Sequence, residues 1–156
     1  MNLNIRKKLM ALLLFPLIFL LLLIFIQLRT LYKDYVQASN ISKLVYVIND
    51  ISNLVHETQV ERGMSSGFLG SGGILYKEEL KLQRTKSDKA HMISKNRILD
   101  VKLEKYNLSL KEESNEVLKE FDELNNIRSK VDTLIVSAPE IVGFYNEIND
   151  KTLRLI

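Results

Sequence analysis

Arg62 is the residue with the clearest chemical potential, because of its position in a helical pattern. The spacing of apolar and small side chains in this region continues through Val55, Thr58, Arg62, Ser65 and Leu69. This position predicts that Arg62 points into the interior of a helical bundle. Its other neighbours are small, namely Gly63, Ser66 and Gly67. A planar guanidinium with space beside it can bind a flat oxyanion such as a carboxylate or nitrate.

A salt bridge is the alternative interpretation of this arginine. A buried charge needs a partner, so a Glu or Asp on a neighbouring helix would satisfy Arg62 equally well. Spacing alone favours the salt bridge over an anion pocket. Arg128 raises the same question in a later helix, where it lies between Leu124 and Val131. Its case for a ligand is weaker, because three acids lie close to it in the sequence: Asp122, Glu123 and Asp132.

The other reactive residues do not form a catalytic constellation. The chain has no cysteine, which excludes disulfides, thiolate metal sites and cysteine nucleophiles. His56-Glu57 begins like a zinc-protease motif, but Val60 stands where the second histidine is required. His91 lies in a polar stretch and is expected at the surface. We therefore predict a protein that is not an enzyme and that needs no metal or cofactor.

The charge distribution argues against nucleic-acid binding. The chain has 22 Lys plus Arg against 19 Asp plus Glu. The excess of three lies in Arg6, Lys7 and Lys8, so residues 29–156 have no net charge. Such a balanced surface has no excess positive charge to attract a phosphate backbone.

An apolar segment near the N-terminus predicts a membrane anchor. Residues Leu9–Ile26 are uncharged and apolar, and Gln27 and Leu28 extend the segment to the roughly 20 residues needed to cross a bilayer as a helix. A cleaved signal peptide is the competing interpretation, but its apolar region is usually only about 7–15 residues long and a small-residue cleavage site follows closely. The nearest such site, Val36-Gln37-Ala38, lies far downstream, so an uncleaved anchor is favoured.

The basic tip sets the expected orientation of the anchor. Under the positive-inside bias, residues 1–8 stay in the cytoplasm, residues 9–28 cross the cytoplasmic (inner) membrane and residues 29–156 lie outside it. Residues 29–156 are predicted to be all-α, and their first helix is expected to continue from the membrane-spanning helix. We expect an antiparallel four-helix bundle, apparently truncated at the C-terminus, where the last helical pattern stops without a cap.

Four helices are expected in total. The first runs from Leu9 to about Leu69 and stops at the glycines of residues 70–73. The second runs from Ile74 to about Leu103, before a turn at residues 105–107. Its apolar stripe is Leu75, Leu82, Met92, Leu99 and Leu103. The third carries a seam of Leu110, Val117, Phe121, Leu124, Val131 and Ile135. Ser137 is expected to cap the fourth, with Glu140 three positions on, and its apolar residues are Ile141, Phe144, Tyr145, Ile148 and Leu155.

Four segments resemble the nitrate- and nitrite-sensing (NIT) domain. His56-Glu57-Thr58-Gln59-Val60-Glu61-Arg62-Gly63-Met64-Ser65-Ser66-Gly67-Phe68-Leu69 is similar to the family's opening pattern H-E-x-Q-x-E-R-G-x-S-[AS]-G-[FY]-L. Residues 83–88 match Q-R-x-x-[ST]-D, residues 128–132 match R-x-x-V-[DN], and Phe144-Tyr145 matches an aromatic pair. The first segment is long and specific, and the others support it in the family's order.

The resemblance implies a helical sensor that binds nitrate or nitrite, commonly in a bacterial methyl-accepting chemotaxis receptor or a sensor kinase. The arginine of the E-R-G motif corresponds to Arg62, so the resemblance turns the balance from a salt bridge to a ligand role. The anion-binding residues it suggests are Arg62, Gly63, Ser65 and Ser66, with Arg84 and Arg128 as secondary candidates. The family's partner arginine belongs to a second half of the domain, which is missing here. Signalling partners would act through that C-terminal region.

A ligand-free scaffold is the alternative function. In that case the chain is a membrane-anchored helical protein that dimerises through its seams. The alternative explains the anchor and the helical repeats, but it gives no reason for the small residues around Arg62. Homodimerisation is expected under either hypothesis.

Overall fold

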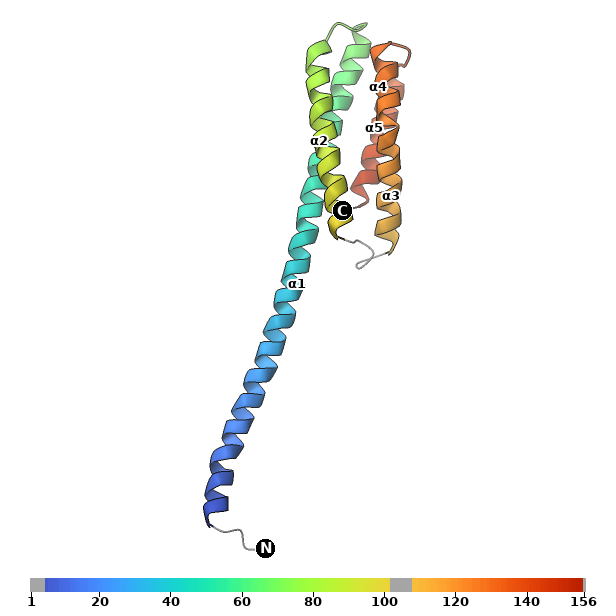
Figure 1. The fold of residues 1–156 in the computed structure, drawn as a ribbon. Coiled ribbons are helices and arrows are strands. Elements are labelled where there is room, and N and C mark those ends of the chain that lie inside the picture. Colours follow the sequence, from blue (N-terminus) through green and yellow to red (C-terminus); the bar gives the residue numbers. More distant parts are fainter. Residues whose placement is uncertain (1–4, 102–107, 156) are drawn as a thin grey trace. The chain divides into compact units, whose positions relative to one another are not determined.

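The computed structural model describes residues 5–101 and 108–155, and every regular element in these ranges is a helix. The helices are α1 (Ile5–Gly70), α2 (Lys77–Val101), α3 (Leu108–Asp122), α4 (Leu124–Asp132) and α5 (Ala138–Leu153). The predicted all-α class is confirmed. The chain divides into two compact units, Met1–Ser42 and Lys43–Ile156, and the second contains the bundle. Within it, α1, α2, the α3–α4 pair and α5 run in alternating directions (Figure 1).

The first unit consists of the N-terminal part of α1. An 18-residue window there has a mean hydropathy of 3.2, and none of that window is buried. By length and composition this helix can cross a membrane, as the sequence predicts. Pro16 lies inside the helix, which membrane-spanning helices tolerate.

Two glycines end α1 as predicted. Gly72 and Gly73 have φ angles of 68° and 88°, in the left-handed region that favours glycine. This turn allows the amide of Gly73 to donate to the carbonyl of Phe68 at 2.8 Å and that of Gly72 to the carbonyl of Leu69 at 3.0 Å. The helix therefore stops with its last carbonyls satisfied.

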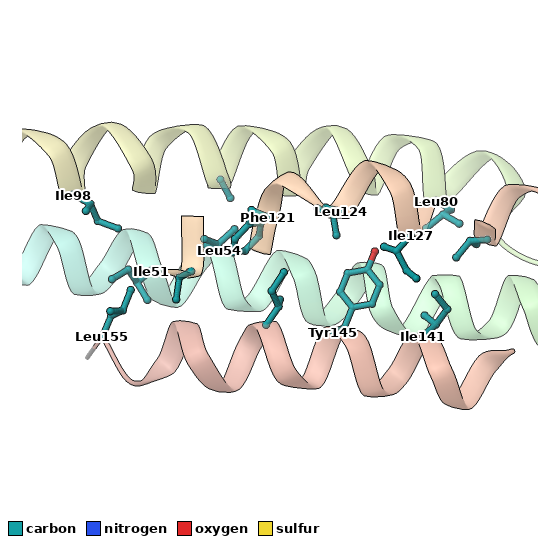
Figure 2. Packing of buried hydrophobic residues seen from close by; sticks show 14 of the residues in the cluster. Ile51, Leu54, Leu80, Ile98, Phe121, Leu124, Ile127, Ile141, Tyr145 and Leu155 are labelled. Atoms are coloured by element: carbon teal, nitrogen blue, oxygen red, sulfur yellow. The ribbon is translucent and has the colours of Figure 1, made fainter. Parts of the chain in front are cut away.

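The bundle core receives side chains from all five helices. Its buried apolar members on α1 are Val47, Ile51, Leu54 and Phe68, and α5 contributes Ile141, Tyr145 and Ile148. Figure 2 shows Ile51 and Leu54 facing the side chains of the other helices, with Phe121 and Leu124 in the same layer. This packing holds α1 in a fixed rotation about its axis, and that rotation decides which polar side chains enter the core.

The predicted apolar stripe of α2 is wrong. Leu75, Leu82, Met92 and Leu99 are all exposed, at 55%, 68%, 57% and 59%. The face of α2 that is buried consists of Leu80, Gln83, Ser87, Ala90, Ser94 and Ile98. The reason is close helix packing. The hydroxyls of Ser87 and Ser94 donate to the α1 carbonyls of Glu57 at 3.3 Å and Asp50 at 3.0 Å, so short polar side chains fit where leucines would not.

The third predicted helix is divided at Glu123 into α3 and α4. Val117, Phe121, Leu124 and Val131 are buried as predicted, but Ile135 is 78% exposed and Val136 is buried instead. Ile135 lies beyond the end of α4 at Asp132, where the helical spacing no longer applies. The predicted turn at 105–107, like Leu103, lies outside the described residues.

The predicted start of α5 is confirmed. Ser137 is its N-cap, and its hydroxyl accepts a hydrogen bond from the amide of Glu140 at 3.3 Å. The apolar face of this helix is also as predicted, with Phe144 half-buried beside the core.

Candidate functional site

The packing of α1 buries Glu61 rather than Arg62. Glu61 is fully buried, together with Thr58 and Ser65 on the same face. Arg62 lies one position further around the helix, is only partly buried and donates to Oδ1 of Asn146 on α5. The prediction that Arg62 points into the interior is therefore wrong. A repeat of three and four residues permits either position, and the buried alternative is the residue that finds partners inside.

Glu61 is the centre of a buried polar network. Its two carboxylate oxygens accept hydrogen bonds from Nε of Arg128 at 2.7 Å and from Nη2 of Arg128 at 2.9 Å. The hydroxyl of Tyr145 donates to the same carboxylate at 2.7 Å. This is a bidentate pair with a third donor, which is the geometry that makes a buried ion pair tolerable. Figure 2 shows the Tyr145 side chain extending from α5 into the bundle.

Arg128 and Arg84 extend the network to α2 and the end of α4. Nη1 of Arg128 donates to Asp88 at 2.6 Å. Nη1 of Arg84 donates to Asp132 at 2.9 Å, and its Nε lies 3.9 Å from the Glu61 carboxylate. Both arginines are therefore engaged by carboxylates. Through these carboxylates the two arginines connect α1, α2 and α4, and Tyr145 adds α5 at Glu61.

The network shifts the pKa values of Arg128 and Tyr145. Burial would by itself lower the pKa of Arg128, but the hydrogen bonds and charges of Glu61 and Asp88 raise that pKa above its usual range. Burial and the adjacent Glu61 charge also raise the pKa of Tyr145 well above its usual value, although Arg128 and Ser65 oppose the change. Arg128 therefore stays charged, and Tyr145 stays a proton donor at any physiological pH.

One protein-family model matches the chain over the region that contains this network. The model of the nitrate and nitrite sensing domain, NIT, matches residues 53–156. The chain belongs to the NIT family. No curated relative and no solved structure matches it. The matched region begins within α1 and contains the whole polar network.

The four NIT-like segments meet in the bundle through the side chains of their polar residues. In the first segment, Glu57 accepts a hydrogen bond from Gln83 of the second at 2.6 Å. The second and third segments are joined by the Arg84–Asp132 and Arg128–Asp88 pairs. Tyr145 of the aromatic pair completes the centre at Glu61. Most of the NIT-like polar residues thus have partners within the bundle.

The other predicted anion-binding residues lie on two different sides of α1. Ser65 is fully buried, whereas Gly63 is exposed and Ser66 partly exposed. A Cβ atom added at Gly63 would meet nothing within 4 Å, but one added at Gly67 would lie 2.7 Å from the ring of Tyr76. Gly67 therefore makes room for a tyrosine, and only Gly63 leaves open space next to Arg62.

Several residues of the site were missed from the sequence. Glu61 and Tyr145 lie within quoted segments, but their roles depend on contacts across 84 residues of sequence. Asn149 is a further buried polar residue, and its Oδ1 lies 2.5 Å from Oγ of Thr58. One signal was present for Glu61, since it lies three residues after Thr58 and four before Ser65, in step with the apolar stripe.

Proposed function

We propose that the chain is a membrane-anchored module that binds nitrate or nitrite and passes the binding event to the membrane. Arg62 is the principal anion-binding residue, with the backbone of Gly63 and the hydroxyl of Ser66 beside it. Ser65 contributes through packing, because its side chain is fully buried. Membership of the NIT family supports the choice of anion.

One observation carries the choice of Arg62. Three arginines lie in the NIT-like segments, and two of them, Arg84 and Arg128, are paired with carboxylates. In the described part of the chain, Arg62 has no ion-pair partner, and its contact is the neutral amide of Asn146. Exchanging a neutral acceptor for an anion strengthens the hydrogen bonds of a guanidinium. Taking Arg128 from Glu61 would instead leave a buried charge uncompensated.

The same contact suggests how binding is transmitted. Arg62 and Asn146 join α1 to α5, so an anion that replaces Asn146 alters the packing between these helices. Because α1 also contains the apolar segment, a shift of α1 is a direct route toward the membrane. Signalling requires only that the anion bind one arrangement of α1 more tightly than another.

We further propose that the module works outside the cytoplasmic membrane as the sensor of a receptor. The basic residues Arg6, Lys7 and Lys8 favour a cytoplasmic N-terminus, which places the anion site outside. Output through a chemotaxis or kinase activity would then be carried by other parts of the receptor. The module itself does no catalysis.

A binding experiment on the full chain in lipid nanodiscs tests this proposal. Nitrate or nitrite at a hundredfold excess over its Kd should raise the free energy of unfolding of the bundle by about 2.7 kcal/mol relative to chloride. Arg62→Gln should abolish this increase. Arg154→Gln, which removes the exposed arginine at the C-cap of α5, is the matched control and should retain it. An unchanged response of Arg62→Gln would remove Arg62 from the site.

The exposed apolar side of α2 favours the scaffold alternative, in which the chain associates without a ligand. Leu82, Met92 and Leu99 offer a surface for a second copy. Sedimentation of the chain in detergent with Leu82→Glu and Met92→Glu would show whether this surface forms a homodimer. Dimerisation that persists without any anion response would favour the scaffold.

A further inference from the structure

A cavity lies between the end of α1, the beginning of α2 and the end of α4. It has a volume of about 200 Å³. Its lining residues are Phe68, Leu80, Lys77, Lys81, Arg84 and Asp132. The first two are buried apolar side chains, and the other four are charged. Arg62 is not among them, so this cavity is separate from the proposed nitrate site.

The cations around this cavity are only partly used by the protein. Among the described residues, Nε of Arg84 is buried without a hydrogen bond and lies 3.9 Å from the Glu61 carboxylate, and the Nη2 contact with the Arg128 carbonyl is long, at 3.5 Å. Lys77 has no ion pair within the described residues. Lys81 pairs with Glu78, but both side chains are mostly exposed, so the pair is weak. Among the lining residues, three cations thus accompany one carboxylate, and Lys77 is the cation without an ion pair in the described part of the chain.

The apolar lining separates this site from a simple inorganic anion site. Phe68 and Leu80 line the cavity but are only 8% and 2% exposed, so the apolar surface that they present to it is small. A short apolar group would cover this surface, and nitrate has no apolar part to do so. The volume is below the range of drug-sized pockets, so it fits only a small molecule.

We propose that this cavity binds a small organic monocarboxylate with a short apolar body. The carboxylate lies between Arg84 and Lys77, and the apolar body lies against Phe68 and Leu80. Asp132 is the competing anion. Its side chain is 54% exposed, so it can turn into solvent when the ligand takes its place on Arg84. The proposal does not depend on nitrate binding at Arg62.

Ligand binding in the cavity would affect the buried network around Glu61. Arg84 lies 3.9 Å from the Glu61 carboxylate, on the helical turn that also contains Arg62. A ligand that draws the guanidinium toward the cavity weakens this contact. The bound monocarboxylate would therefore change the affinity of the Arg62 site for nitrate. Bound nitrate would change the affinity of the cavity for the monocarboxylate by the same factor.

Titration of the full chain in nanodiscs with butyrate, hexanoate and benzoate tests the proposal, with thermal unfolding as the readout and chloride and nitrate as reference anions. At least one carboxylate should stabilise the bundle more than chloride does. Lys77→Gln should weaken its binding about tenfold, which corresponds to the loss of one charge-assisted hydrogen bond. Lys86→Gln, an exposed lysine elsewhere on α2, is the matched control and should bind normally.

Two further variants separate this site from the nitrate site. Arg62→Gln should bind the carboxylate as the natural chain does, and Arg84→Gln should lose it. If Arg84→Gln fails to fold, the double variant Lys77→Gln and Lys81→Gln takes its place, since both lysines are exposed. The proposal is overturned if no carboxylate exceeds chloride, or if binding is lost in Arg62→Gln and retained in the lysine variants.

Discussion

The two sides of one helical turn in α1 differ in how their charges are satisfied. Glu61 faces the core, where Arg128 and Tyr145 saturate its carboxylate. Arg62 lies at the edge, where its described contact is a neutral amide, and Gly63 beside it faces open space. Inside, every charge is fixed by the fold. At the edge, the guanidinium of Arg62 has no carboxylate partner among the described residues, which is why we propose that the anion binds there.

The largest effect is expected from Glu61. Glu61→Leu leaves Arg128 buried without its bidentate partner, which should lower the free energy of unfolding by about 3–5 kcal/mol. Chemical denaturation of the chain in detergent measures this loss. The double variant Glu61→Leu with Arg128→Met should recover much of it, because no unpaired charge remains. Equal losses in the single and double variants would show that the pair itself, and not the orphaned arginine, determines stability.

Local signals in the sequence were enough for two helix ends, the end of α1 and the start of α5. Glycines at 72 and 73 and a serine cap at 137 act through their own backbone, so their effects can be predicted without knowing the fold. The face that each helix buries was harder to predict. Leu82 and Met92 are more hydrophobic than Ser87 and Ser94, yet the serines are buried because α2 lies close to α1.

The polar residue that α1 buries was predicted to within one position. The apolar spacing and the family resemblance both led to the turn that contains Glu61 and Arg62. Choosing between Glu61 and Arg62 required knowing how α1 is rotated about its axis. That rotation is set by packing against residues more than 60 positions away in the sequence, such as Arg128. A short repeat tolerates an error of one residue, but a carboxylate and a guanidinium in neighbouring positions do not have interchangeable roles.

Two glycines on α1 sharpen the comparison between core and edge, with a smaller expected effect. Gly63→Ala meets no neighbour and should stabilise the helix by about 0.5–1 kcal/mol. Gly67→Ala should bring no such gain, because its methyl group would collide with the Tyr76 ring. If Gly63 leaves space for the anion, Gly63→Ala should also bind nitrate more weakly. Thermal unfolding with and without nitrate measures both effects, and a destabilised Gly63→Ala variant would contradict the open surface seen at this position.

The smallest effect is expected from His91, which tests whether the core tolerates another charge. The sequence predicted His91 at the surface, but its ring stacks on Phe121 with centroids 4.5 Å apart, and its Nε2 is buried without a hydrogen-bonding partner in the described part of the chain. Burial and then Lys95 lower the pKa of His91 below its ordinary value of 6.5, while Asp122 and Asp88 oppose this and Arg128 adds to it.

The sign of the pH dependence follows from that lowered pKa. As the pH falls below about 7, the unfolded chain takes up a proton at His91 before the folded chain does, so the bundle loses stability until the folded pKa is passed. His91→Gln removes this contribution. The loss of unfolding free energy between pH 7.5 and pH 5.5 should therefore be smaller in His91→Gln than in the natural chain. An identical loss would mean that the imidazole is charged as easily in the core as in water, and that the strict division between a fixed interior and an adaptable edge does not extend to α2.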